Sequence, residues 1–233
     1  MQETLFFDSD GLRLHGTLHL PAAEKPPFVI GVHGMLSNGD SPKQQALAKK
    51  CSSRGIAYFR FDHRGCGKSQ GVFSRVTTFD GRRTDLAAAA SMLSKRTDLG
   101  GILGLFGSSL GGAVVLSLAG NLDVRAIVTL AAPVSMSSIM VPVSYDTDPA
   151  LSGITKGQMD FDISDSLPLV HSILVCHGDA DEVVPYENAL NIYESANQPK
   201  KLLRLRGSDH RVSSTEQQQV FMENTLEWFA RAK

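Results

Sequence analysis

The feature that most constrains the fold of this chain is an apolar run that leads into a Gly-x-Ser-x-Gly pentapeptide and then into a helix-forming segment. The run covers residues 102–106, the pentapeptide covers 107–111, and residues 110–122 are rich in Ala, Val and Leu. A strand that is apolar on both faces belongs inside a covered sheet. Ser109 is then expected on a tight, strained turn between strand and helix, with its hydroxyl at the carboxyl end of the sheet. The alternative is a strand-to-helix turn without chemistry.

The rest of the chain alternates strands and helices. Apolar runs and turn residues predict strands at 5–8, 12–20, 28–33, 56–61, 102–106, 124–131, 172–176 and 200–205. Helices are expected at 42–54, 82–95, 110–122, 186–196 and 215–233. Repeated strand–helix units predict an α/β fold with a mainly parallel central sheet covered by helices on both faces. The first two strands read as an antiparallel hairpin at one edge of that sheet.

One region, residues 134–170, breaks this alternation, because it is rich in Pro and Gly and has a poor helical signal. A connection of this length is expected to be functional or disordered. It is interpreted as a small lid insertion over Ser109, within a single domain that spans residues 1–233. The insertion contains an apolar cluster that either lines a substrate pocket or packs on the core. The cluster consists of Ile139, Met140, Val141, Val143 and Tyr145.

Composition narrows the function classes. The 233 residues carry a formal net charge of -1 without a basic block, so no nucleic-acid partner is expected. Three cysteines in no framework spacing favour reduced thiols, and no Cys/His spacing resembles a metal site. The N-terminus lacks a signal-peptide pattern and no apolar run approaches membrane-spanning length, so a cytoplasmic location and no membrane partner are expected. These features leave the oligomeric state open.

A serine hydroxyl needs a base to act as a nucleophile, and the base needs an orienting acid. Candidates belong on loops at the carboxyl ends of strands, where Ser109 is expected. Asp179 and Asp181 follow the strand at 172–176, and either can serve as the acid or cap the adjoining turn. His210 follows the strand at 200–205 and is the candidate base. The chain order Ser109, acid, His210 is that of one hydrolase fold class.

Two backbone N–H groups are expected to stabilise an oxyanion beside Ser109. Leu110 supplies one, because it follows the serine. The second candidate is Met35, in the turn after the strand at 28–33, where Gly34 lets the backbone approach closely. His33 is expected to be a structural turn residue rather than a base. Contact with substrate is predicted for Leu36, Met140, Val141 and Tyr145.

Taken together, these motifs resemble those of serine hydrolases with the α/β-hydrolase fold. The matching stretches are His33-Gly34, 61–69, 107–111, 177–181 and Asp209-His210, and the resemblance extends over nearly the whole chain. The resemblance selects Asp181 over Asp179 as the acid. It also implies that Asp62 and Arg64 form an ion pair or hydrogen-bond set that shapes a loop, and that no cofactor is needed.

A looser similarity over residues 71–86 points to bacterial cinnamoyl and feruloyl esterases, whose lids are often larger than 134–170. The resemblance therefore implies a carboxylic ester hydrolase with a small-molecule ester substrate and a more open site or a short acyl pocket. Alternatives on the same scaffold are a thioesterase, a small-peptide or C–C bond hydrolase, and a weakly active ligand-binding protein. Cys66 is expected to be a buried, inert thiol near this site.

Overall fold

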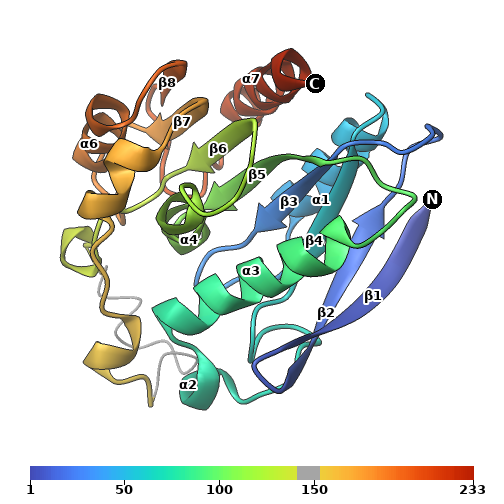
Figure 1. Ribbon diagram of the computed structural model, residues 1–233. Helices are drawn as coiled ribbons and strands as arrows, with labels where there is room; N and C mark the ends of the chain where they lie inside the picture. The colour runs from blue at the N-terminus through green and yellow to red at the C-terminus, as the bar shows by residue number, and fades with distance from the viewer. Residues whose placement is uncertain (141–152) are drawn as a thin grey trace.

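A central eight-stranded sheet organises the computed structural model, which describes residues 1–140 and 153–233 (Figure 1). The strand order is β1-β2-β4-β3-β5-β6-β7-β8. Strand β1 pairs antiparallel with β2 and β2 with β4, whereas β4, β3 and the following strands run parallel. The predicted α/β architecture with an antiparallel hairpin at one edge is therefore confirmed. The strands are β1 (Gln2–Ser9), β2 (Leu12–His19), β3 (Phe28–Val32), β4 (Ala57–Phe61), β5 (Ile102–Ser108), β6 (Ala126–Leu130), β7 (Ile173–Gly178) and β8 (Lys200–Leu205).

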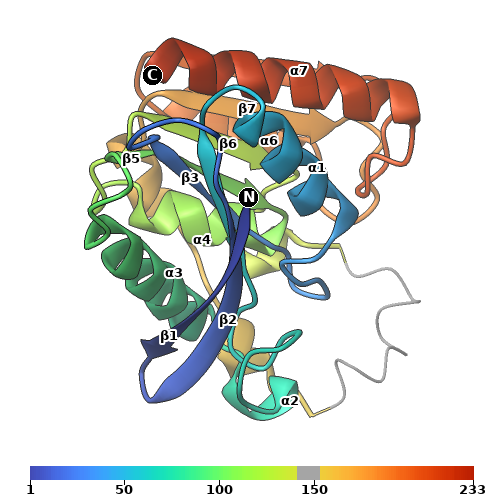
Figure 2. The same ribbon diagram turned by 90° about the vertical axis from the view of Figure 1, so that its right-hand side faces the viewer.

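Helices cover both faces of the sheet, as Figure 2 shows. Helices α1 and α7 lie on one face, and α3, α4 and α6 lie on the other. Side chains of successive strand residues point to opposite faces of the sheet and join different hydrophobic cores. Val29 packs beneath α1 and α7, while Phe28 and Ile30 pack beneath α3 and α4. The helices are α1 (Pro42–Ser52), α2 (Phe73–Val76), α3 (Phe79–Ser94), α4 (Leu110–Leu118), α6 (Glu187–Ser195) and α7 (Thr215–Ala232), with 3₁₀ turns η1 (Met136–Ser138), η3 (Lys156–Met159) and η4 (Ser164–Leu169).

Two helix boundaries differ by three residues or more from the sequence-based expectation. Helix α3 begins at Phe79 rather than at residue 82, because the Thr78 hydroxyl accepts a hydrogen bond from the Gly81 N–H (2.8 Å) and caps the first turn. Helix α4 ends at Leu118 rather than at residue 122. The extra turn of α3 places Arg82 inside the helix, where its side chain is fully buried.

The described parts of the 134–170 insertion pack on the sheet's α3 and α4 side. Ser135 forms an isolated antiparallel bridge with Asp162, and the Phe161 ring stacks on Phe79 with ring centroids 4.3 Å apart. Residues 141–152 lie outside the described part of the chain, and with them the predicted contact residues Val141 and Tyr145. The role of this insertion as a lid stays a prediction.

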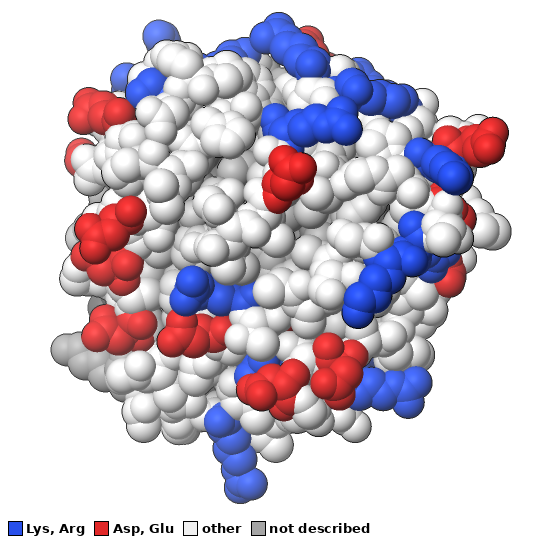
Figure 3. Space-filling model, viewed as in Figure 1, with Lys and Arg blue, Asp and Glu red and all other residues white. Residues whose placement is uncertain are grey.

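The surface seen from the α3 side carries basic and acidic side chains interspersed with one another (Figure 3). Over residues 1–140 and 153–233, none of the helices combines the length and the apolar character that crossing a bilayer requires. All three cysteines are free and buried.

Candidate active site

Ser109 occupies a strained turn between β5 and α4. Its backbone has φ 52° and ψ -128°, a left-handed φ that a residue with a side chain rarely adopts. The turn is held because the Ser109 N–H donates to the carbonyl of Leu130 on the neighbouring strand β6 (2.8 Å). A Cβ at Gly111 would lie 2.5 Å from the Val32 carbonyl oxygen, so glycine is required for α4 to begin this close to β3. The pentapeptide therefore makes the sharp turn that its glycines predict.

The structure brings the three predicted side chains Ser109, His210 and Asp181 into one hydrogen-bonded chain. The Ser109 Oγ lies 3.1 Å from His210 Nε2, and His210 Nδ1 lies 2.8 Å and 3.0 Å from the two Asp181 carboxylate oxygens. The three residues come from loops after β5, β8 and β7, because parallel strands end at the same edge of the sheet. This geometry matches a nucleophile, a base and an orienting acid.

Asp181 is held as an ionised carboxylate. Its side chain is fully buried, and burial alone would raise the pKa. Hydrogen bonds from His177 and His210 and from the backbone N–H of Val184 outweigh that effect and hold the pKa of Asp181 well below its ordinary value. His177 Nε2 lies 3.2 Å from Asp181 and 2.8 Å from the Val184 carbonyl oxygen. This histidine was known from the sequence only as part of a motif, and the structure shows that it contacts the candidate acid.

The competing acid, Asp179, makes different contacts. Its carboxylate accepts hydrogen bonds from Arg204 Nε (2.7 Å) and from the Gly207 N–H (2.5 Å). It therefore ties the turn after β7 to the turn after β8. The resemblance-based choice of Asp181 agrees with this arrangement, because Asp181 is the one of the two that contacts His210.

The His33-Gly34-Met35 turn lies directly over Ser109. A Cβ at Gly34 would be 3.3 Å from the Ser109 Cβ. His33 Nε2 accepts the His63 N–H (3.1 Å), so the proton is on Nδ1, which donates to the Gly34 carbonyl (2.7 Å). Burial and neighbouring His63 lower the pKa of His33 well below its ordinary value, so the ring stays neutral. His33 is thus a turn residue in the structure.

The two predicted oxyanion donors, Met35 and Leu110, both border the same pocket as Ser109. Within residues 1–140 and 153–233, neither backbone N–H donates to a protein acceptor. Backbone N–H groups without a protein partner are available to a substrate oxygen or to water.

A pocket of about 480 Å³ opens beside Ser109 and has a largely apolar wall. Leu36, which is 38% exposed, lines it as predicted. Met140 does not: it is 63% exposed, and its backbone N–H donates to the Val183 carbonyl (2.8 Å). The apolar lining that sequence reasoning missed includes Leu130, Met136, Met159 and Val183. Lys43 and Arg211 add two cationic side chains to the lining.

The loop after β4 corrects one expectation. Arg64 does not pair with Asp62; its guanidinium lies 2.9 Å from the Asp85 carboxylate on α3. Asp62 instead forms the hydrogen-bond set that was the other possibility, accepting the N–H groups of Gly39 (2.8 Å) and Lys68 (2.9 Å). The sequence motif suggested a local pair, whereas the fold brings Asp85, 21 residues further along the chain, next to Arg64.

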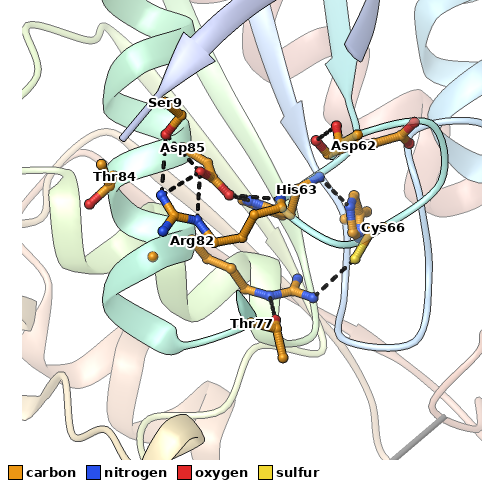
Figure 4. A network of polar contacts seen from close by, with 12 residues as sticks. Ser9, Asp62, His63, Cys66, Thr77, Arg82, Thr84 and Asp85 are labelled. Atoms are coloured by element: carbon orange, nitrogen blue, oxygen red, sulfur yellow. Dashed lines mark hydrogen bonds and ion pairs between the residues drawn. The ribbon is translucent and has the colours of Figure 1, made fainter. Parts of the chain in front are cut away.

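Cys66 belongs to the same loop. It is buried, and burial raises its pKa. Its sulfur accepts a hydrogen bond from Arg82 (3.6 Å), as Figure 4 shows. An inert structural thiol, as expected, fits these surroundings.

Comparison with known proteins agrees with this geometry. The sequence profile of the serine aminopeptidase S33 family matches residues 24–151. The uncharacterized protein YfhR of Escherichia coli K12 is 30% identical over 218 residues, which cover 88% of this chain and 72% of YfhR. The mitochondrial palmitoyl-protein thioesterase ABHD10 of Rattus norvegicus is 28% identical over 217 residues, which cover 82% of this chain and 71% of ABHD10.

Solved structures show the same fold. The esterase domain of a Rhodothermus marinus protein superposes with a TM-score of 0.75 at 25% identity, over 99% of both chains. Est1E of Butyrivibrio proteoclasticus, solved with ferulic acid, superposes with a TM-score of 0.76 at 22% identity, over 97% of this chain and 99% of Est1E. The α/β-hydrolase fold and the resemblance to its esterase-like group are therefore confirmed.

Proposed function

Because the chain belongs to the serine aminopeptidase S33 family of α/β-hydrolases, we propose that it is a serine hydrolase that cleaves carboxylic esters through an acyl-enzyme. The observation that carries the proposal is the hydrogen-bonded chain from Ser109 through His210 to Asp181. A serine hydroxyl hydrogen-bonded to one imidazole nitrogen, with a carboxylate hydrogen-bonded to the other, is the arrangement that activates a serine.

In the first half of the proposed reaction, the Ser109 Oγ attacks the ester carbonyl while His210 Nε2 takes the hydroxyl proton. Asp181 holds the His210 Nδ1–H and stabilises the imidazolium that forms. The backbone N–H groups of Met35 and Leu110 stabilise the negative oxygen of the tetrahedral intermediate. The intermediate collapses with cleavage of the C–O bond, and the leaving alcohol takes the proton from His210.

In the second half, water attacks the acyl-enzyme carbonyl and gives a proton to His210 Nε2. The second tetrahedral intermediate uses the same two N–H donors. Its collapse breaks the bond to Ser109, returns the proton to the serine oxygen and releases the acid. Each transferred proton therefore passes through His210 Nε2. Apart from the substrate and the attacking water, the groups in this scheme are side-chain and backbone groups of the chain.

The pocket supports an apolar acyl group as the part of the substrate bound beside Ser109. Its wall includes Met136, Met159, Leu130 and Val183, and flexible methionines adapt to irregular apolar shapes. A thioester is the second candidate substrate, favoured by the similarity to the palmitoyl-protein thioesterase ABHD10. Both substrates would use the same acyl-enzyme and differ only in the leaving group.

The test is hydrolysis of p-nitrophenyl esters with acyl chains of two to eight carbons by the wild type and by Ser109→Ala. We expect saturable turnover by the wild type and a loss of at least about 10⁴-fold in kcat for the variant. Ser117→Ala, which removes a buried serine hydroxyl from α4 away from the pocket, is the matched control and should keep full activity. Equal activity of Ser109→Ala and the wild type would overturn the proposal. Butyryl thioesters measured in parallel rank the two leaving groups.

A further inference from the structure

We propose that Arg82 is a positioning residue: its buried guanidinium fixes the Gly34–Met35 peptide so that the Met35 N–H faces the substrate oxygen. The inference rests on the proposed function, in which that N–H stabilises an oxyanion. Arg82 was not among the candidate residues of the sequence, where it stood at the expected first position of a helix. The structure places it near the start of α3, with its side chain fully buried.

The guanidinium of Arg82 holds both carbonyls of the turn over Ser109. Nη1 donates to the Gly34 carbonyl (3.3 Å) and Nη2 donates to the Met35 carbonyl (3.2 Å). Nε donates to the Thr77 hydroxyl (3.3 Å), as Figure 4 shows. This third hydrogen bond fixes the plane of the guanidinium. The planar guanidinium of an arginine, with its donors in fixed directions, can set the orientation of two successive peptide groups, whereas the ammonium of a flexible lysine side chain cannot.

Orientation of the Gly34 carbonyl determines the orientation of the Met35 N–H. In a trans peptide the C=O and N–H bonds point in opposite directions. The Gly34 oxygen is drawn into the protein by two donors, Arg82 Nη1 and His33 Nδ1. The Met35 N–H of the same peptide is thereby turned the other way, away from Arg82, and Gly34 itself lies against Ser109.

The charge of Arg82 also acts on this peptide electrostatically. Hydrogen bonds polarise one another within a low-dielectric interior. A cation on the carbonyl side of the Gly34–Met35 peptide withdraws electron density from it and makes the Met35 N–H a stronger donor. Positioning and polarisation therefore act in the same direction.

The partners of Arg82 are unusual for a buried arginine. Within residues 1–140 and 153–233, Arg82 forms no salt bridge, and its acceptors are two carbonyls, a hydroxyl and a thiol. Nearby Arg64 is also buried, but it forms an ion pair with Asp85 (2.9 Å). Burying a cation without a carboxylate is costly. A contribution to the reaction gives a reason to retain this arrangement, whereas stability alone does not.

The test compares Arg82→Lys and Arg82→Met with Arg64→Lys, a matched buried arginine that does not contact the turn. Each variant is assayed for kcat and KM on p-nitrophenyl butyrate and for inhibition by an alkyl trifluoromethyl ketone. The Ser109 oxygen adds to the ketone carbonyl carbon, the serine proton passes to His210, and the former carbonyl oxygen becomes an oxyanion that needs the same N–H donors. We expect kcat to fall about 10-fold in Arg82→Lys, which keeps a cation, and about 10²-fold in Arg82→Met, the lower end of the range for loss of one oxyanion donor.

In both Arg82 variants KM should stay within about 3-fold of the wild type, and the inhibition constant of the ketone should rise by the same factor by which kcat falls. Arg64→Lys should lower stability and leave kcat and ketone inhibition unchanged. Unchanged kcat and ketone inhibition in a folded Arg82→Lys would overturn the inference, as would a change confined to KM. Failure of the proposed function is recognised separately, by equal activity of the wild type and Ser109→Ala.

Discussion

Two histidine–aspartate pairs in this molecule have almost the same local geometry but different surroundings. His210 Nδ1 lies 2.8 Å from Asp181, and His63 Nδ1 lies 3.1 Å from Asp85. The far nitrogen of His210 faces the Ser109 hydroxyl, and the ring is 11% exposed at the pocket. The far nitrogen of His63 has no partner among the described residues, and its ring packs against Phe61 in the fully buried interior.

The comparison shows that a histidine–aspartate pair becomes a candidate site only where a nucleophile and a pocket meet it. In both pairs, hydrogen bonds to the carboxylate outweigh burial and hold its pKa well below the ordinary value. The buried pair His63–Asp85, the inner pair, has different charges around it, because Asp85 also accepts hydrogen bonds from Arg64 and Ser9. We interpret the inner pair as part of the scaffold beneath the His33-Gly34-Met35 turn.

Among the substitutions that test this comparison, Asp181→Asn is expected to have the largest effect, a loss of kcat. An amide in place of the carboxylate favours the wrong imidazole tautomer and no longer stabilises the charged ring, so kcat should fall about 10⁴-fold. The measurement is turnover of p-nitrophenyl butyrate, with circular dichroism to show that the variant is folded. Activity within 10-fold of the wild type would remove Asp181 from the proposed mechanism.

The same substitution in the inner pair, Asp85→Asn, should act on stability instead. It leaves the buried Arg64 guanidinium with only the exposed Asp10 carboxylate (3.5 Å), and removing one partner of a buried ion pair is expected to cost about 3–5 kcal/mol of unfolding free energy. The kcat per folded molecule, measured below the midpoint of urea unfolding, should change less than 10-fold. A stable Asp85→Asn protein with a loss of activity as large as that of Asp181→Asn would contradict the distinction between the two pairs.

The inner pair should also make stability depend on pH. Burial lowers the pKa of His63 from 6.5 to about 4, against the raising effect of Asp85 and with the lowering effects of Arg82 and Arg64. The unfolded chain therefore takes up a proton before folded His63 does, and stability falls as the pH drops from about 6.5 toward 4. We expect a loss of about 2 kcal/mol at pH 5 from this residue.

Urea unfolding of the wild type and of His63→Asn at pH 7 and pH 5 measures this loss. The variant should lose less stability between the two pH values than the wild type does. Substitution of exposed His171 by Asn is the matched control and should leave the pH dependence as it is. Parallel curves for the wild type and His63→Asn would show that His63 does not sense pH in this way.

The smallest effect is expected from Ser9→Ala, which removes one hydrogen bond (2.7 Å) from the Asp85 carboxylate while Arg64 and His63 stay in place. The expected loss is about 1 kcal/mol of unfolding free energy with unchanged kcat. Chemical denaturation checks the first value and ester hydrolysis the second. A decrease in kcat for this variant would show that the inner network is coupled to the reaction more directly than its contacts indicate.

Much of the fold was predictable because its determinants are local. The apolar runs fixed every strand of the sheet to within a few residues, and the Ser-Asp-Gly turn at residues 9–11 indicated the edge hairpin. The start of α3 was missed because the capping hydroxyl of Thr78 precedes the apolar pattern. The insertion was recognised only by its break in the alternation, since 3₁₀ turns such as η4 carry no hydrophobic period.

The candidate site was predictable where residues follow strand ends in chain order, as Ser109, Asp181 and His210 do. Residues that meet through tertiary packing were not predictable. The pairing of Arg64 with Asp85 and the contact of Arg82 with the Gly34–Met35 turn join segments that are about 20 and 50 residues apart, and no local pattern marks them. The pocket methionines Met136 and Met159 belong to the insertion and were missed for the same reason.

The most direct test of the central claim is labelling with an alkyl fluorophosphonate, which reacts with an activated serine to form a phosphonyl-serine and release fluoride. Intact mass and peptide mapping report the number and place of labels. The account predicts one label per chain, on Ser109, and labelling that is slowed by several orders of magnitude in His210→Ala but not in His63→Asn. A folded wild type that stays unlabelled, or that is labelled at another residue, would contradict it.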